Sequence, residues 1–342
     1  GSLKSTLNRS HLPEHICPNT FVRTHLPKHS LGIFTMSKLR IGTVGSDSLL
    51  AGPMSDRLRF AERISNSPID HLFIADHISF HTGLGMDGIV NAATLATMFP
   101  EMDVLIGVYL LALRHPVTVA RQLSSLSRSA PGRIVLGVGV GGEDRHEMEI
   151  CGVDPARRGA HTNNSLAALN KLLEGKPVTY NCEFFSFEDA LIKPSPKPRI
   201  PTLVGGRSDA AIKRAALLGD GWLGVWASAT RFGNVLQHIN ELAEQRSDIP
   251  DWQHGLQLWA GVGENARRHV ANGMEEMYRT PFEKFEKYSP YGSAQAIADF
   301  IAPYVENGAR IFNIAARGEN EETCIDTIAD VSAILHNAFP EL

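Results

Sequence analysis

The sequence lacks three features that would place it at once in a specialised class of protein. Among 342 residues there is no C-x-x-C pair, and only four widely separated cysteines, Cys17, Cys151, Cys182 and Cys324. This argues against a disulfide scaffold or a cysteine zinc site. The net charge of −4 predicts neither nucleic acid nor an anionic membrane as a partner. No apolar run approaches the roughly 18 residues that a membrane span requires, so we expect a cytoplasmic globular protein with reduced thiols.

The first 35 residues differ in composition from the rest of the chain. They contain four histidines and a single acidic residue, Glu14, and they show neither a helical nor an alternating period. Gly1-Ser2 resembles a cloning remnant, and Met36 is a candidate native start. We therefore expect residues 1–35 to be a poorly ordered tail or upstream extension, with a transit peptide or a histidine metal site as alternatives. Residues 36–342 then form a single domain.

Short apolar runs alternate with helical patterns from residue 39 onward. The runs are continuously apolar, which is typical of parallel strands covered by helices. Eight such units predict an α/β fold, a (β/α)8 TIM barrel. The predicted strands are 40–46, 71–77, 103–113, 133–141, 200–206, 221–226, 256–263 and 310–316, and the predicted helices are 57–66, 89–98, 117–129, 163–175, 208–219, 230–246, 264–278, 293–307 and 321–338.

Two insertions interrupt this alternation, one after strand 4 and one after strand 7. Residues 175–201 are rich in aromatic residues and proline, which favours a short hairpin followed by a stiff approach to the fifth strand. Residues 278–292 form a long connection before the last strand, and we expect this segment to be a lid or a substrate loop.

The stretch RIVLGVGVGGEDRHE, residues 133–147, contains G-x-G-x-x-G at Gly137, Gly139 and Gly142. This spacing is the fingerprint of a dinucleotide site when a helix follows at once and an acidic residue ends the next strand about 20 residues later. Here a polar segment with its own glycine and proline follows instead. We favour glycines at the end of a barrel strand that allow a flat ligand to approach the backbone. A plain tight turn and a dinucleotide site are the alternatives.

Asp76 and His77 end the second predicted strand, which is where barrel enzymes carry catalytic residues. An imidazole suits proton transfer at neutral pH. The alternative is an Asp–His pair that only buttresses the strand end. His81 lies four residues after His77, but zinc would need further ligands that the neighbouring sequence does not offer, so we expect no metal site.

Several segments in order resemble one known family. FIADH (73–77) is followed by LLALRHPVTVARQLSSLSRSAPGRIVLGVGVG (110–141) and by CGVDPARRGAHTNNSLAAL (151–169). EFFSFEDALIKPSPKPRIPTLVGG (183–206) and AALLGDGW (215–222) come next. This combination is similar to the bacterial luciferase-like flavin and deazaflavin oxidoreductases. The resemblance implies a (β/α)8 barrel that binds FMN or F420 at its C-terminal mouth, without a metal.

The resemblance also implies roles for individual residues. Asp76 and His77 would be catalytic, with His77 facing the flavin as a proton donor or acceptor, or as a stabiliser of the reduced ring. A non-prolyl cis peptide would lie behind the ring at Gly107–Val108. The remaining cofactor-binding residues would be Gly139 and Gly141 beside the ring, and Gly205, Gly206, Arg207 and Ser208 around a phosphate at a helix N-terminus.

Other positions stay open at this stage. Glu147 matches a common acidic residue of the family, whereas Gly142 replaces a frequent tryptophan, so the local contact there is uncertain. Arg114 could anchor the site or belong to a helix-entry signal before Pro116. Trp226 and Trp259 could line a substrate cavity or lie in the core; both lie at or near predicted strands.

The resemblance leads to a functional hypothesis, namely FMN-dependent monooxygenation of a small organic substrate, with reduced flavin supplied by a separate reductase. The first alternative is F420-dependent hydride transfer, since a deazaflavin does not support the oxygen chemistry of FMN. A non-catalytic flavin-binding barrel is a second alternative, and a barrel lyase or isomerase without flavin is a third. The family resemblance further implies a homodimer.

Overall fold

The computed structural model describes residues 38–248 and 252–342. The tail predicted for residues 1–35, with its alternatives, lies outside the described residues. Within them, no helix is long and apolar enough to cross a membrane.

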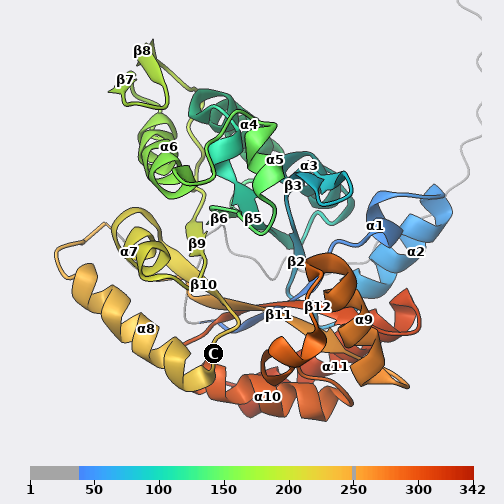
Figure 1. Ribbon diagram of the computed structural model, residues 1–342. Coiled ribbons are helices and arrows are strands. Elements are labelled where there is room, and N and C mark those ends of the chain that lie inside the picture. Colours follow the sequence, from blue (N-terminus) through green and yellow to red (C-terminus); the bar gives the residue numbers. More distant parts are fainter. Residues whose placement is uncertain (1–37, 249–251) are drawn as a thin grey trace, which may run out of the picture. The chain divides into compact units, whose positions relative to one another are not determined.

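Eight parallel strands close into a barrel, which confirms the predicted fold (Figure 1). Each strand pairs with two parallel neighbours; Thr43, for example, lies opposite both Leu72 and Ile314. Around the barrel the order is β1, β12, β11, β10, β9, β6, β5 and β2. These strands are β1 (Arg40–Val44), β2 (His71–Ile74), β5 (Asp103–Leu110), β6 (Ile134–Gly139), β9 (Thr202–Gly205), β10 (Gly221–Val225), β11 (Gly255–Gly261) and β12 (Ile311–Arg317).

Helices follow the strands and lie outside the barrel, as Figure 1 shows. Local sequence sets several of their starts: Pro116 occupies the first position of α4, and Ser208 caps α7 by accepting a hydrogen bond from the Ala211 amide. The long helices are α2 (Met54–Ser65), α3 (Gly88–Met98), α4 (Pro116–Ser129), α6 (Arg158–Leu172), α7 (Asp209–Leu218), α8 (Ala229–Leu242), α9 (Ala266–Tyr278), α10 (Ala294–Glu306) and α11 (Glu321–Ala338). Short helices α1 (Asp47–Leu50) and α5 (Arg145–Glu149) were not predicted.

The two predicted insertions are present. β7 (Val178–Asn181) and β8 (Ser186–Ala190) form the expected hairpin beside α6. Residues 279–292 contain two 3-10 turns, Phe282–Lys284 and Glu286–Tyr288, and the first turn packs the buried Phe282 against α9.

The predictions for the strand ends after β2 and β5 were wrong. The predicted strand 71–77 stops at Ile74, and a separate antiparallel hairpin follows, β3 (His77–Phe80) with β4 (Leu84–Met86). The predicted strand 103–113 stops at Leu110 and continues as a 3-10 turn, Leu111–Leu113. In both places the chain leaves the barrel at its C-terminal mouth. After β5 the apolar pattern continues because Leu111 and Ala112 stay buried.

Candidate functional site

A cavity of about 700 Å³ opens at the C-terminal ends of the barrel strands, the end at which barrel enzymes carry their active sites. Most of the residues that we predicted for the site line this cavity. They are Asp76, His77, Gly107, Val108, Gly139, Gly141, Gly205 and Gly206. Arg207 and Ser208 follow directly after them in sequence but do not line the cavity.

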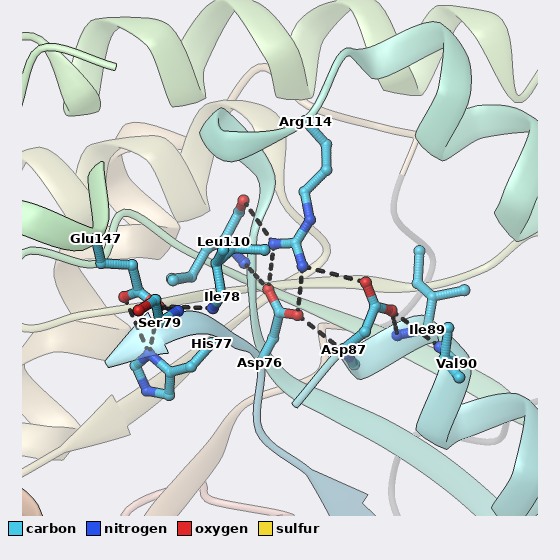
Figure 2. Close-up of polar contacts among 11 residues, drawn as sticks. Asp76, His77, Ile78, Ser79, Asp87, Ile89, Val90, Leu110, Arg114 and Glu147 are labelled. Atoms are coloured by element: carbon cyan, nitrogen blue, oxygen red, sulfur yellow. Dashed lines mark hydrogen bonds and ion pairs between the residues drawn. The ribbon is translucent and has the colours of Figure 1, made fainter. Parts of the chain in front are cut away.

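The side chain of His77 is held by a carboxylate from α5, the short helix that follows β6 (Figure 2). Its Nδ1 lies 3.1 Å from Glu147 Oε2 on α5. Glu147 is 1% exposed, and it also accepts hydrogen bonds from the amides of Ile78, at 2.7 Å, and Ser79, at 3.1 Å. A carboxylate on Nδ1 makes that nitrogen the protonated one and directs Nε2 elsewhere. Within the described ranges no group bonds Nε2, and the residue lines the cavity.

Asp76 has a different environment from its neighbour, as Figure 2 shows. It is 1% exposed and accepts hydrogen bonds from the amides of Gly88 and Leu110, both at 2.9 Å. The guanidinium of Arg114 donates two hydrogen bonds to the same carboxylate, at 2.5 and 2.8 Å, and a third to the carboxylate of Asp87. The pair Asp76–Arg114 thus ties β2 to the end of β5 and to the start of α3. The carboxylate is fully used by these donors, which favours a positioning role.

The peptide bond between Gly107 and Val108 is cis, as the resemblance implied. The register between β5 and β6 shifts at this point, between Ile106 and Tyr109. Val108 lines the cavity and packs on the apolar layer inside the barrel that includes Leu105 and Leu223. The bulge therefore forms part of the cavity wall.

Neighbouring protein atoms by themselves favour glycine at three positions of the cavity wall. A Cβ on Gly139 would collide with Cγ2 of Val108, and a Cβ on Gly205 would lie 2.7 Å from its Cγ1. A Cβ on Gly141 would lie 2.6 Å from Cε of Met148. Gly139 and Gly141 line the cavity, and close approach of a flat ligand to them stays a prediction.

Gly142 adds no space to the cavity. Its φ of +116° is favourable for glycine, and a Cβ there would lie 2.6 Å from Nε of Arg158. That guanidinium donates a hydrogen bond to the Gly141 carbonyl at 3.2 Å. Arg158 thus fills the space beside Gly142.

The predicted phosphate site surrounds the start of α7. Gly206 has a φ of +117°, and its carbonyl accepts a hydrogen bond from Trp222 Nε1 at 2.6 Å. Arg207 lies with its guanidinium 5.3 Å from the ring centre of Trp226, and Arg231 donates a hydrogen bond to the Arg207 carbonyl at 3.1 Å. Two exposed guanidiniums and the N-terminus of α7 thus lie close to Gly206, together with the Asp209 carboxylate in the first turn of that helix.

A chain of polar side chains crosses the barrel interior below the cavity. His71 Nε2 lies 2.8 Å from Asn313 Oδ1, and Asn313 Nδ2 donates to Gln257 Oε1 at 3.3 Å. Gln257 lines the cavity. Burial lowers the pKa of His71 to about 4, so the imidazole is neutral.

An aromatic wall completes the cavity. Trp226, Trp259 and Tyr278 all line it; the indole Nε1 of Trp259 donates to the Tyr278 hydroxyl at 3.2 Å. Burial raises the pKa of Tyr278 to about 12, which keeps its hydroxyl protonated. Arg317 lies with its guanidinium 4.4 Å from the ring centre of Trp259. Trp226 and Trp259 are thus cavity residues, one of the two possibilities left open by the sequence.

Sequence reasoning did not pair Glu147 with His77, and it missed Arg317 in this wall. Glu147 lies 70 residues from His77, and no spacing rule connects them. Arg317 is the last residue of β12, so its strand end was the only signal, whereas Tyr278 ends α9 and begins the segment 278–292 that we expected to be a lid or substrate loop. Arg114 both binds Asp76 and precedes the helix start at Pro116, so both of its proposed roles hold. Nowhere in the described ranges do three or more His, Cys, Asp or Glu side chains gather as a metal site would require.

The fold is a (β/α)8 barrel with a cavity at the C-terminal ends of its strands. The family model of luciferase-like monooxygenases matches residues 30–330, and the chain belongs to that family.

The chain is similar both to a dehydrogenase and to a monooxygenase. It is 30% identical over 192 residues to an F420-dependent glucose-6-phosphate dehydrogenase of Beutenbergia cavernae, covering 54% of this chain and 56% of that protein. It is 25% identical over 300 residues to 4-hydroxyprotoasukamycin monooxygenase of Streptomyces nodosus subsp. asukaensis, covering 80% and 76%. The matches span 56–60% of the length of the first curated relatives.

Among solved structures, the fold is similar to an F420-dependent secondary alcohol dehydrogenase in complex with an F420-acetone adduct. The TM-score is 0.76 at 19% sequence identity, and the match covers 87% of this chain and 99% of that one. At this level of identity the likeness supports the barrel fold and not a particular reaction.

Proposed function

We propose that the protein is a flavin-dependent oxidoreductase, and that FMN-dependent monooxygenation of a small organic substrate is its reaction. The observation that carries this proposal is the His77–Glu147 pair in the wall of the cavity. Glu147 holds Nδ1, and Nε2 is left for a ligand. A volume of about 700 Å³ lies within the range of cofactor and ligand sites, roughly 300–1,000 Å³.

The residues of the cavity fit a flat cofactor with a terminal phosphate. Val108 and the backbone of Gly139 offer an apolar wall for a ring. The amides at the start of α7, with Arg207 and Arg231 close by, would hold a phosphate. Bound FMN supplies the redox chemistry with oxygen, and reduced FMN would come from a separate reductase.

The chain's own residues bind, orient and move a proton. Glu147 fixes the ring of His77 so that Nε2 can donate or accept a proton, or stabilise negative charge on a reduced ring. Asp76 acts through structure: with Arg114 it fixes the strand end from which His77 projects. Trp259 and Tyr278 exclude water from the opposite wall.

F420-dependent hydride transfer is the second candidate. It is supported by the curated F420-dependent relative and by the F420-dependent alcohol dehydrogenase with the same fold. The free Nε2 of His77 also suits deprotonation of an alcohol during hydride removal.

Titration of the full-length chain with FMN and with F420, each followed by absorption spectroscopy, tests both candidates. We expect tight binding of one of them, and turnover of that cofactor with substrate that falls at least tenfold in His77→Asn. His81→Asn is the matched control, because His81 lies on the same hairpin but does not line the cavity. Tight binding of neither cofactor would refute the flavin assignment. Binding without turnover under any reductant and substrate would favour a non-catalytic flavin-binding barrel.

A further inference from the structure

Arg317 ends β12 and presents a guanidinium to the cavity. It makes one hydrogen bond, from Nη1 to the Ala316 carbonyl at 2.8 Å. A guanidinium carries five N–H donors, so most of this group is available to a ligand. Its face lies over Trp259, which leaves its N–H edge as the polar part.

Other half-buried arginines in the described ranges have more partners. Arg133 donates three hydrogen bonds to carbonyls, and Arg114 pairs with two carboxylates. In contrast, no carboxylate within residues 38–248 or 252–342 comes within ion-pair distance of Arg317. The neighbouring carboxylate of Glu321 accepts instead from the Ser46 hydroxyl at 2.7 Å. Burial lowers the pKa of Arg317, but an arginine stays charged in proteins.

Packing between α9 and Trp259 fixes the position of this guanidinium. A Cβ on Gly273 of α9 would lie 3.2 Å from Cγ and Nε of Arg317, and 3.2 Å from the Trp259 ring. The glycine thus makes room for the arginine between the helix and the indole. Arg317 is half-buried, and the carboxylates of Glu321 and Glu276 act on it only from beyond ion-pair distance, so a ligand carboxylate could be its direct partner.

We propose that Arg317 binds a carboxylate of the substrate, and that Trp259 and Tyr278 contact an aromatic or apolar body attached to it. The proposal rests on the proposed function only in taking this cavity as the substrate site. A cofactor phosphate is the other source of an anion, but the predicted phosphate site follows β9, three strands away from β12 around the barrel. The carboxylates of Asp47, Glu143 and Glu321 also line the cavity. Because these carboxylates repel an anion, we expect an anionic group to bind only beside the positive charge of Arg317.

Matched pairs of small probes test the proposal on the full-length chain. Benzoate and benzamide have nearly the same shape and differ in charge, as do phenylacetate and phenylacetamide. Binding is followed by tryptophan fluorescence or by ligand-observed NMR, with wild type, Arg317→Gln and Arg268→Gln. Arg268 is exposed on α9, so its variant removes the same charge outside the cavity.

We expect wild type to bind the carboxylate at least tenfold more tightly than the amide in at least one pair. Arg317→Gln should abolish this preference and leave amide binding unchanged, whereas Arg268→Gln should keep the preference. A wild type without anion preference in either pair refutes the proposal, and so does an equal loss of both probes in Arg317→Gln, which would indicate a structural role.

Cofactor titrations distinguish the two sources of the anion. Arg317→Gln should bind FMN and F420 as the wild type does. If cofactor affinity falls while the carboxylate preference remains, Arg317 serves the cofactor and the proposal is wrong. Failure of wild type to bind either cofactor would refute the flavin assignment, but the preference for carboxylate over amide would still decide the role of Arg317.

Discussion

Replacing Glu147 by glutamine removes the charge beside His77 while keeping the shape of the side chain. Glu147 Oε2 lies 3.1 Å from His77 Nδ1, and the carboxylate is 1% exposed. A hydrogen bond to a charged group contributes about 1.5–3 kcal/mol, against about 0.5–1.5 kcal/mol for a neutral pair. The difference, roughly 1–1.5 kcal/mol, corresponds to about a tenfold loss of turnover if the imidazolium forms during reaction.

The measurement is kcat with the cofactor that binds, together with urea unfolding of the same proteins. Glutamine retains an acceptor oxygen for the amides of Ile78 and Ser79, so Glu147→Gln should unfold much like the wild type. Glu147→Ala instead leaves both buried amides unpaired, at about 1–3 kcal/mol each.

A double-mutant cycle shows whether Glu147 acts through His77. Glu147→Gln should cause no further loss of turnover in a protein that already carries His77→Asn. Additive losses in kcat would contradict the idea that the carboxylate serves the imidazole. An unchanged kcat in the single variant would remove Glu147 from the mechanism altogether.

Three further predictions concern stability and follow from buried groups. Asp76→Asn breaks the buried pair with Arg114 and should lower the free energy of unfolding by about 3–5 kcal/mol in urea. For His71, the folded-state pKa of about 4 lies below the unfolded value near 6.5, so the unfolded chain takes up the proton first on acidification. Its contribution is complete above about pH 6.5 and is lost down to about pH 4, up to roughly 3 kcal/mol. Gly139→Ala places a methyl group against Val108 and should cost about 1–3 kcal/mol, with partial recovery in combination with Val108→Ala.

Each of these predictions has a control in the same chain. Asp87→Asn should be mild, because Asp87 is 38% exposed and asparagine also caps helices. His71→Gln should flatten the acid dependence of the free energy of unfolding between pH 6.5 and 4, and an unchanged slope would contradict the assignment. Gly159→Ala on α6 should be neutral or stabilising, since its Cβ would make an ordinary 3.5 Å contact with Arg214. A loss in Gly139→Ala that Val108→Ala does not relieve would speak against the clash.

The sequence predicts the barrel because its strands are buried on both faces. Strands such as β11, Gly255–Gly261, therefore read as continuous apolar runs, and the prediction of 256–263 differs from it by one or two residues at each end. The hairpin β3–β4 gives no such signal: its strands have four and three residues, HISF and LGM, with no continuous buried run. Pairing between the two short segments defines this hairpin, and the sequence pattern does not reveal that pairing.

The sequence predicts those site residues that lie at the ends of strands, but not the contacts between them. The position of His77 after β2 follows from the order of strands and helices. Its partner Glu147 arrives from α5 after β6, two strands further along the barrel, and the turn after β6 decides which side chain of that region meets the imidazole. Asp76 lies at the same strand end as His77, but its carboxylate is bonded to Arg114. The sequence does not distinguish the roles of the two residues, whereas their contacts do.

The G-x-G-x-x-G stretch shows why spacing alone does not identify a site. A side chain on Gly137 would collide with the Ile106 carbonyl, and one on Gly139 with Val108, whereas Gly142 faces Arg158. The first two glycines lie on β6, where β5 bulges toward them, and the third has a positive φ beside an arginine from α6. The three glycines of the pattern thus each make room for a different protein neighbour. In a dinucleotide fingerprint the glycines lie in the turn between a strand and the helix that follows at once, with the second glycine beside the pyrophosphate. Here Gly137 and Gly139 lie within β6, and the next helix begins only at Arg145, so the stretch does not have that geometry.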